Sequence, residues 1–403
     1  MAIASKFGHC TFDIPVRHVR KVPFRPTIRV PKNFSERAYE LRRLDMELER
    51  FILRATDYSD LLVEAWGANI HRSVSVEGNP LTLQQVKKVA RDSLKNNQAG
   101  VEKRYPDWPR QEIVNHILVH KRPDVWRSDW TLPMILGLHR FLMDGAPKAA
   151  QPGKFRDHYG AIYNDAKEET HVNAPPEAIE QELQALLDWR NTQAESLFPV
   201  VAAAVFFHEF ESIHPFSDGN GRTGRVLFHT YLQTTGLPNS HLCLVEPLLM
   251  GDLDLYYRIL GWTDKTESYT ELIDFFTDSL LESYRNARNR LKGKDLLSSD
   301  LDEIAKRLLV QAKARGTWFN NADAGEWVDS VTLATVRRHL GELARKDVLE
   351  QEGATRDRRY RFKDPLRSLR EMELTLPPLE GKNKGTAMVL AFKEDVQRPN
   401  MAN

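Results

Sequence analysis

The chain has 403 residues, with 57 Lys or Arg against 56 Asp or Glu, so its formal net charge is +1. This length predicts two or three domains, and the balanced charge argues against global attraction to nucleic acid or membranes. The longest apolar run, 197–207, is too short to cross a bilayer, and the basic N-terminus lacks the apolar stretch of a signal peptide. The only two cysteines, Cys10 and Cys243, give no disulfide framework. We therefore expect a cytoplasmic protein without membrane contact.

The N-terminal part contains two helical patterns, at 36–56 and 58–70. The second has a single apolar stripe, formed by Leu61, Leu62, Ala65, Trp66 and Ile70. It leads into the stretch Ser73-Val74-Ser75-Val76-Glu77-Gly78-Asn79, in which Ser73 and Glu77 are four residues apart and would share a helix face. By its residues alone, this stretch can equally be a capped helix end before an Asn79-Pro80 turn.

The middle of the chain continues the helical pattern, with candidates at 108–120, 133–143 and 200–212 and a later one at 271–291. Glycines and poor alternation between Gly153 and Tyr163 instead predict a short β-hairpin. After His171, Pro176 suits the first turn of another helix. The apolar stripe of that helix is formed by Ile179, Leu183, Leu186 and Leu187.

Twelve residues from His214 to Arg225 combine groups that can handle a polyphosphate. Three of them, Gly219, Asn220 and Gly221, can turn consecutive N–H groups into one concavity. A helical pattern at 222–234 then places a helix N-terminus directly after this turn, which is a ready anion site. Arg222 and Arg225 lie three residues apart on its first turn and can bind phosphate oxygens.

Two more side chains belong to the same motif. Asp218 is a hard oxygen ligand, suited to a Mg²⁺ ion that shares phosphate oxygens, and His214 can take a proton from an attacking hydroxyl. The glycine spacing also matches parts of the dinucleotide-binding and P-loop patterns, but both need a preceding strand where 200–212 is helical. A loop with solvated arginines alone would not explain the flanking His214 and Asp218.

This motif resembles the signature of Fic-domain proteins, His-Pro-Phe-x-(Asp/Glu)-Gly-Asn-Gly-Arg-x-x-Arg, and matches it at every defined position. The resemblance extends over roughly residues 30–290. It implies a mainly α fold, namely an all-helical Fic core with a small β-hairpin flap. It also implies a protein adenylyltransferase, which moves AMP from ATP to a hydroxyl side chain of a target protein and releases pyrophosphate.

The resemblance assigns a role to each matching residue. His214 would deprotonate the target hydroxyl, and Asp218 would hold Mg²⁺ between the α- and β-phosphates of ATP. Arg222 and Arg225 would bind the β- and γ-phosphates. The phosphates would be cradled by Gly219, Asn220 and Gly221. Tyr257 would lie near the adenine, although core packing explains this position equally well. The flap would align an extended target segment by strand pairing.

The stretch from Ser73 to Asn79 resembles the inhibitory motif of the same family, (Ser/Thr)-x-x-x-Glu-(Gly/Asn). In relatives this glutamate pairs with the second arginine of the signature, so the resemblance implies that Glu77 restrains Arg225 and occupies the place of the γ-phosphate. An N-terminal inhibitory helix in the same chain, at about 58–79, indicates the self-inhibited subclass. The same glutamate could instead activate water for removal of AMP from a modified target.

A polar link near 292–295 marks a domain boundary. Beyond it, 301–313 and 330–346 have helical patterns, while 348–350 and 360–362 read as strands of a hairpin. This order resembles a winged helix-turn-helix. Its basic residues, which could meet DNA phosphates, are Arg337, Arg338, Arg345, Lys346, Arg356, Arg358 and Arg359. Acidic neighbours dilute this patch, so DNA binding through 330–362 is not the favoured reading.

We therefore expect an N-terminal helical region at 1–130, a Fic core at 131–291, a winged-helix-like domain at 298–364 and a tail at 365–403. Two classes of function remain open. In the first, the chain is an auto-inhibited adenylyltransferase that uses ATP and Mg²⁺ and modifies a target protein, which could be the chain itself. In the second, it is a DNA-binding regulator with a nucleotide-sensing pocket. The sequence does not fix the oligomeric state, and a homodimer is compatible with it.

Overall fold

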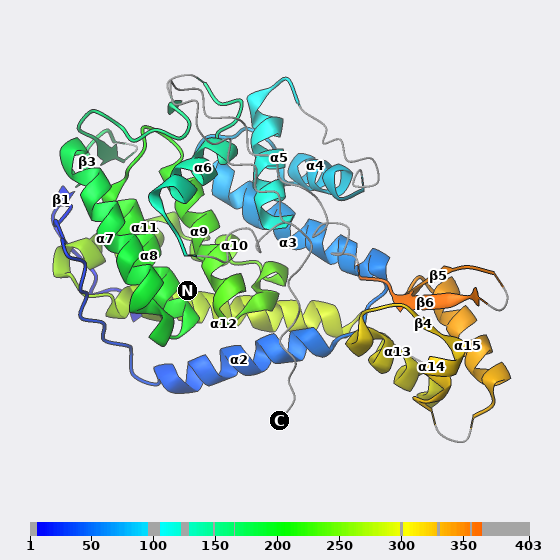
Figure 1. The fold of residues 1–403 in the computed structure, drawn as a ribbon. Helices are drawn as coiled ribbons and strands as arrows, with labels where there is room; N and C mark the ends of the chain where they lie inside the picture. The colour runs from blue at the N-terminus through cyan, green and yellow to red at the C-terminus, as the bar shows by residue number, and fades with distance from the viewer. Residues whose placement is uncertain are drawn as a thin grey trace.

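The computed structural model describes residues 6–95, 105–121, 129–147, 150–164, 166–298, 301–328, 331–354 and 357–364. The expected tail, the start of the expected helix at Ser330 and the basic residue Arg356 lie outside these ranges. The described chain is mainly helical, as predicted, and Figure 1 shows a large helical body with a smaller C-terminal unit at one end. In the described part of the chain, no helix combines the length and apolar character needed to cross a membrane.

The helical body is built around one central pair, α8 (Pro199–Ile213) and α9 (Asn220–Thr235), which pack against each other. Helix α8 is apolar on nearly every side and almost wholly buried, which is typical of a helix enclosed by others. The helices around this pair are α2 (Phe34–Arg50), α3 (Ala55–Ser75), α4 (Leu83–Lys95), α5 (Trp108–Lys121), α6 (Leu132–Leu142), α7 (Ile179–Thr192), α10 (Glu246–Leu249), α11 (Leu253–Thr266) and α12 (Thr270–Lys292).

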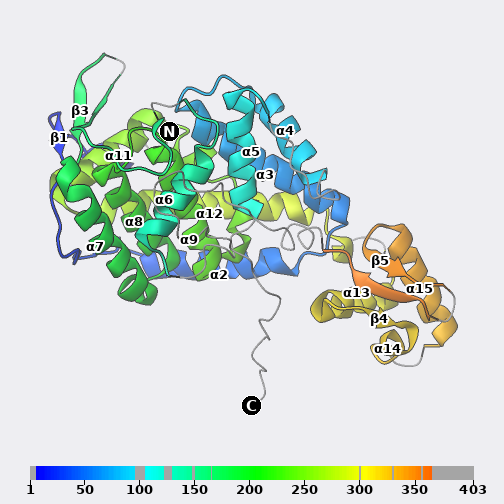
Figure 2. The ribbon, with the colours of Figure 1, turned by 45° about the horizontal axis from the view of Figure 1, so that its top comes forward.

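A small sheet stands at the end of the body that lies away from the C-terminal unit (Figure 2). It consists of β1 (Val16–Arg17), β3 (Glu169–Val172) and β2 (Ala161–Tyr163) in that order. Strand β3 pairs antiparallel with β2 and parallel with β1, so β2 forms an open edge. The hairpin predicted at 153–163 therefore begins later and returns through β3. The prediction missed β1, because its partner is more than 150 residues away in the chain.

The helix predicted at 36–56 is in fact two helices, because 51–54 is extended between α2 and α3. Ile52 in this segment is only 2% exposed and belongs to the core of the C-terminal unit. Its N–H donates to Asp295 (3.0 Å), its carbonyl accepts from the Leu296 N–H (2.8 Å), and Lys313 donates to the carbonyls of Glu49 and Phe51. This docking overrides the local helical pattern. The helix predicted at 58–70 is longer than expected and reaches Ser75.

The C-terminal unit contains α13 (Glu303–Arg315), β4 (Phe319–Asn320), α14 (Asn321–Gly325), α15 (Leu333–Arg345), β5 (Leu349–Glu352) and β6 (Arg359–Phe362). The predicted two helices and hairpin are present, but the sequence reading missed β4 and α14. The three strands form one antiparallel sheet in the order β4-β6-β5. Its core is separate from that of the main body and is centred on Leu308, Phe319, Leu340 and Tyr360.

Candidate active site

His214 ends helix α8 in a left-handed conformation, with φ 52° and ψ 63°. Its backbone N–H still bonds the carbonyl of Phe210 (3.0 Å), which closes the helix. The ring Nδ1 lies 3.2 Å from the carbonyl oxygen of Glu211, and because a carbonyl only accepts, Nδ1 carries the proton. Burial lowers the pKa of His214 to about 4, although the Glu211 carbonyl opposes this shift. The ring is thus neutral at pH 7, with a lone pair on Nε2 for proton uptake.

The turn after His214 is braced from within. The side chain of Asn220 accepts from the backbone N–H of Phe216 and donates to its carbonyl, both at 2.8 Å. The side chain of Asn220 thus holds the backbone of the turn in place. Gly219 has φ 82°, and a Cβ at this position would lie 2.7 Å from the sulfur of Met143. The turn can adopt this shape only with glycine at position 219.

Helix α9 begins immediately after this turn, with Gly219 as an N-cap that has no side chain to satisfy the first N–H groups. Such a helix N-terminus attracts anions through its free N–H groups and its dipole. The anion present is the carboxylate of Glu77: a Cβ on Gly221 would lie 2.5 Å from Glu77 Oε1 and 2.6 Å from Arg225 Nη1. Glu77 therefore covers the first turn of α9.

Arg225 is the residue that receives this carboxylate. Its Nη2 donates to Glu77 Oε1 (2.7 Å) and to the carbonyl of Ser73 (3.0 Å), and its Nε donates to Ser73 Oγ (2.8 Å). The guanidinium side chain is 8% exposed, against 26% for Glu77. The nearby carboxylate of Glu77 raises the pKa of Arg225 against the opposing effect of burial. The structure thus brings Ser73, Glu77 and Arg225 together across 148 residues of chain.

Arg222 is held between two carboxylates. It donates through Nη1 to Glu112 of α5 and through Nη2 to Asp218. Glu112 also accepts from the side chain of Asn79 (2.6 Å), the last residue of the stretch from Ser73 to Asn79. Asp218 is about half exposed, and its contacts with Arg222 and with the Gly219 N–H both fall on Oδ1. Arg222 and Glu112 therefore connect the stretch from Ser73 to Asn79 with the turn that carries Asp218.

The sequence reading missed two buried carboxyl groups of the site. Glu112 lies 110 residues before Arg222, and no local pattern distinguishes it from any other polar residue of α5. Glu211 lies in the last turn of α8, and its Oε1 would be 2.3 Å from a Cβ on Gly224. Burial raises the pKa of Glu211 to about 8, so this carboxyl is mostly protonated near neutral pH. Its proximity to the signature would have been the only sequence clue.

Two tyrosines of α11 border the site. Tyr256 is 3% exposed and Tyr257 is 51% exposed, with their rings edge to face at 5.3 Å. Tyr256 is buried with its hydroxyl bonded to Arg225, while Tyr257 presents an accessible ring at the rim. No cluster of three or more His, Cys, Asp or Glu side chains within the described ranges could hold a metal ion. A cation at Asp218 would need further oxygens from a bound ligand.

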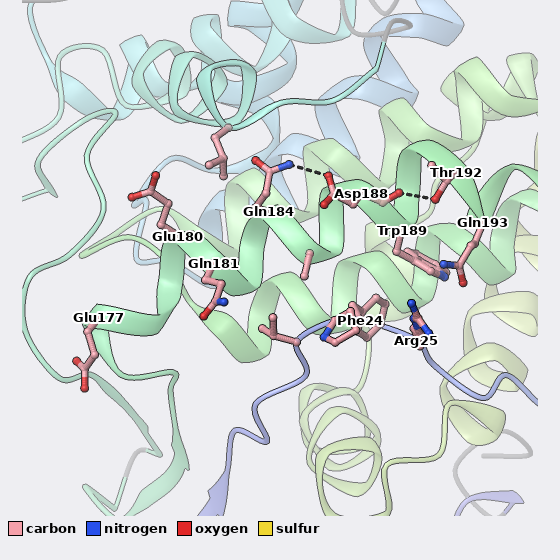
Figure 3. Close-up of a pocket in the computed structure, with 14 residues that line it drawn as sticks. Phe24, Arg25, Glu177, Glu180, Gln181, Gln184, Asp188, Trp189, Thr192 and Gln193 are labelled. Atoms are coloured by element: carbon pink, nitrogen blue, oxygen red, sulfur yellow. Dashed lines mark hydrogen bonds between the residues drawn. The ribbon is translucent and has the colours of Figure 1, made fainter.

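A separate cavity of 690 Å³ lies between α7 and the segment 22–25 (Figure 3). It is lined by polar side chains of α7, including Gln184 and Asp188, above the buried ring of Trp189. It contains none of the residues singled out by the sequence. The candidate active site is therefore the turn between α8 and α9 together with the end of α3.

The site thus combines a partly buried neutral histidine, a half-exposed carboxylate and a helix N-terminus with two arginines, which are groups that can bind a phosphorylated ligand. Residues 129–232 match the sequence model of the Fic/DOC family. A Fic family protein from Desulfovibrio desulfuricans G20 has a similar fold, with a TM-score of 0.54 and 21% identity over 84% of this chain and 98% of its own.

Several curated relatives are named Protein adenylyltransferase Fic. That of Drosophila willistoni is 31% identical over 179 residues, which cover 43% of this chain and 33% of the relative. That of Nematostella vectensis is 28% identical over 185 residues, covering 43% and 39%. That of Drosophila yakuba is 29% identical over 230 residues, covering 54% and 43%. The matched part therefore spans between about a third and somewhat less than half of the length of these relatives.

Proposed function

We propose that this protein is an adenylyltransferase that moves AMP from Mg-ATP to a hydroxyl side chain of a target protein, and that Glu77 inhibits it. The observation that carries the proposal is the carboxylate of Glu77, which bonds Arg225 and lies over the first turn of α9. A helix N-terminus with a paired arginine is the natural place for a phosphate group. Glu77 occupies that place.

In the proposed reaction, Nε2 of His214 takes the proton of the target hydroxyl as its oxygen attacks the α-phosphorus of ATP. The bond from this phosphorus to the bridging oxygen of the β-phosphate breaks, and pyrophosphate leaves. The neutral ring and the donated Nδ1–H of His214 suit a general base. Such in-line transfer depends mainly on positioning and on charge stabilisation.

The phosphate chain would lie along the main-chain N–H groups of Gly219 to Gly221, with Arg225 at its far end and Arg222 beside the β-phosphate. Asp218 fits a Mg²⁺ ion because it is a hard, half-exposed oxygen ligand next to this cradle. When bound, the ion would neutralise phosphate charge. Asp218 would supply one protein ligand, and the phosphates would supply others.

Charge balance supports an inhibitory role for Glu77. Two guanidinium groups, of Arg222 and Arg225, face three carboxylates, of Glu77, Glu112 and Asp218. With Glu77 in place, the site has no positive charge left for a polyphosphate. When Glu77 leaves, Arg225 becomes free to bind another anion. Because Arg225 is buried, this interaction is strong.

The open edge of β2 would receive the target. Backbone groups of an edge strand are free to pair with an added strand, and β2 is the outer strand of the order β1-β3-β2. Tyr163 on this strand is 60% exposed. The target is a protein with an extended segment that bears a hydroxyl side chain, and a second copy of this chain is one candidate.

We propose that the C-terminal unit is a winged-helix module in which α15 and the β5–β6 hairpin are the exposed parts. Three basic residues of these parts are paired with carboxylates: Arg338 with Glu342, Arg359 with Glu352, and Arg361 with Glu350. This pairing favours a protein partner over DNA. Binding of labelled duplex DNA by the full chain, with affinity falling steeply as salt rises, would support DNA instead.

The test uses α-phosphate-labelled ATP with Mg²⁺ and compares wild type, Glu77→Gly and Glu77→Gly/His214→Ala. Strong self-labelling of the single variant only is expected. Absence of label in all three, also with added candidate targets, would refute transfer. The alternative, removal of AMP with Glu77 activating water, is tested by adding wild type to labelled Glu77→Gly protein. Release of AMP would favour removal as the main activity.

A further inference from the structure

We propose that Arg156 is a positioning residue that holds His214 and the flap (β2 and β3) in a fixed relative position, so that a hydroxyl group bound at the flap lies within reach of the base. This inference deepens the proposed transfer activity and rests on it. Arg156 lies in the segment before β2 and is 3% exposed. No residue of the nucleotide cradle, from Asp218 to Arg225, is among its hydrogen-bond partners in the described chain.

Arg156 bonds the backbone on both sides of the catalytic turn. Its Nε donates to the carbonyl of His214 (2.7 Å) and its Nη2 to that of Ile213 (3.2 Å). Its own backbone N–H donates to the carbonyl of Pro215 (3.0 Å). Three successive carbonyls around His214 are thus fixed by one residue. This matters because His214 is a non-glycine residue in a left-handed conformation, which the surroundings must enforce.

The same guanidinium bonds the flap. Its Nη1 donates to the carbonyl of His158 (2.7 Å), and its Nη2 also donates to the carbonyl of Ala174, two residues after β3 ends. Between these points, the Asn173 N–H donates to the carbonyl of Gly160 (3.1 Å). One planar side chain therefore joins the start of the hairpin, its end and the catalytic turn.

Arg156 has no carboxylate partner in the described part of the chain, and burial lowers its pKa. A buried guanidinium without a counter-ion is costly, so the four backbone carbonyls that accept from it must compensate. A lysine could not do this, because a single ammonium group cannot span carbonyls on several sides as a planar fork does. The charge also lies close to His214, where it disfavours protonation of the base.

A second contact fixes the flap independently. Nε2 of His171 in β3 donates to the carbonyl of Ser212 (3.2 Å), and its Nδ1 lies 3.3 Å from Asp264. Ser212 Oγ donates to the same carboxylate (2.8 Å). Both anchors join the flap to the last turn of α8, so the flap and His214 move together.

The test compares Arg156→Lys and Arg156→Gln in the Glu77→Gly background, with Lys154→Gln as an exposed control that removes a neighbouring charge. We expect kcat for AMP transfer to fall at least about 30-fold in both Arg156 variants, with the Kd of ATP changed less than threefold. Lys154→Gln should match its parent. Millimolar guanidinium, but not methylammonium, should restore transfer in Arg156→Ala, because only the planar cation reaches several carbonyls.

Retention of kcat in folded Arg156→Gln would overturn the proposal, and so would a loss of ATP affinity that equals the loss of kcat. Hydrogen exchange tests the role of Arg156 separately from the proposed function, because the measurement does not require the protein to be active. The N–H groups of His214 and Asn173 should exchange at least tenfold faster in Arg156→Gln, while those of α9 keep their rates. Unchanged exchange rates at both positions would refute the positioning role of Arg156, even if the protein transfers no AMP.

Discussion

Replacement of Glu77 by glutamine should raise the affinity for ATP, because it removes the charge that occupies the phosphate position with little change of shape. Two unit charges about 4 Å apart interact by about 4 kcal/mol at an effective dielectric constant of about 20. Glu77 is about a quarter exposed, so solvent screening reduces this to roughly 2 kcal/mol. If ATP must displace this contact, its Kd should fall about 30-fold.

Calorimetric titration with Mg-ATP measures this change, and transfer of labelled AMP measures its effect on activity. Glu64→Gln is the matched control, because Glu64 lies on α3, the helix that leads into the turn of Glu77, is about half exposed and pairs with Lys87. Ser73→Ala should give a smaller gain, since it removes one hydrogen bond to Arg225 worth about 1 kcal/mol. Equal ATP affinity in Glu77→Gln and Glu64→Gln would show that Glu77 does not compete with phosphate.

Three further predictions concern stability. Gly224→Ala should lower the free energy of unfolding by about 2 kcal/mol in denaturant titration, because its methyl group would overlap Glu211. Gly341→Ala has open space around it and should raise the free energy of unfolding by up to about 1 kcal/mol. Shifts of the same sign in the two variants would contradict this reasoning. Burial lowers the pKa of His120 to about 3, whereas its pKa in the unfolded chain is near 6.5. The unfolded chain therefore binds the proton first as the pH falls. The free energy of unfolding should decrease by about 1.4 kcal/mol per pH unit as the pH drops from about 6.5 towards 3. Melting of His120→Phe should depend less on pH over that range, and an unchanged slope would exclude His120 as the source. Ile52→Asp should separate the C-terminal unit from the helical body. Calorimetry should then show two unfolding transitions instead of one, with the added transition at a lower temperature.

The sequence by itself determined most helices, because apolar spacing reports which face of each segment avoids water. It also determined the chemistry of the central motif, since the turn and the first turn of α9 lie within twelve residues and need only local geometry. The spacing predicted that Ser73 and Glu77 share a helix face, but α3 ends at Ser75 and Glu77 lies in the turn that follows it. Both residues nevertheless bond Arg225.

Only the tertiary structure decided which distant groups meet. The break at 51–54 arises because Ile52 is more stable in the core of the C-terminal unit than as a helical residue. Strand β1 exists only because β3 pairs with it. Glu112 and Arg156 carry no local signal, since their partners lie 110 and 58 residues away. Buried charges and carbonyls take whichever partner packing brings within reach, and that choice depends on the whole fold.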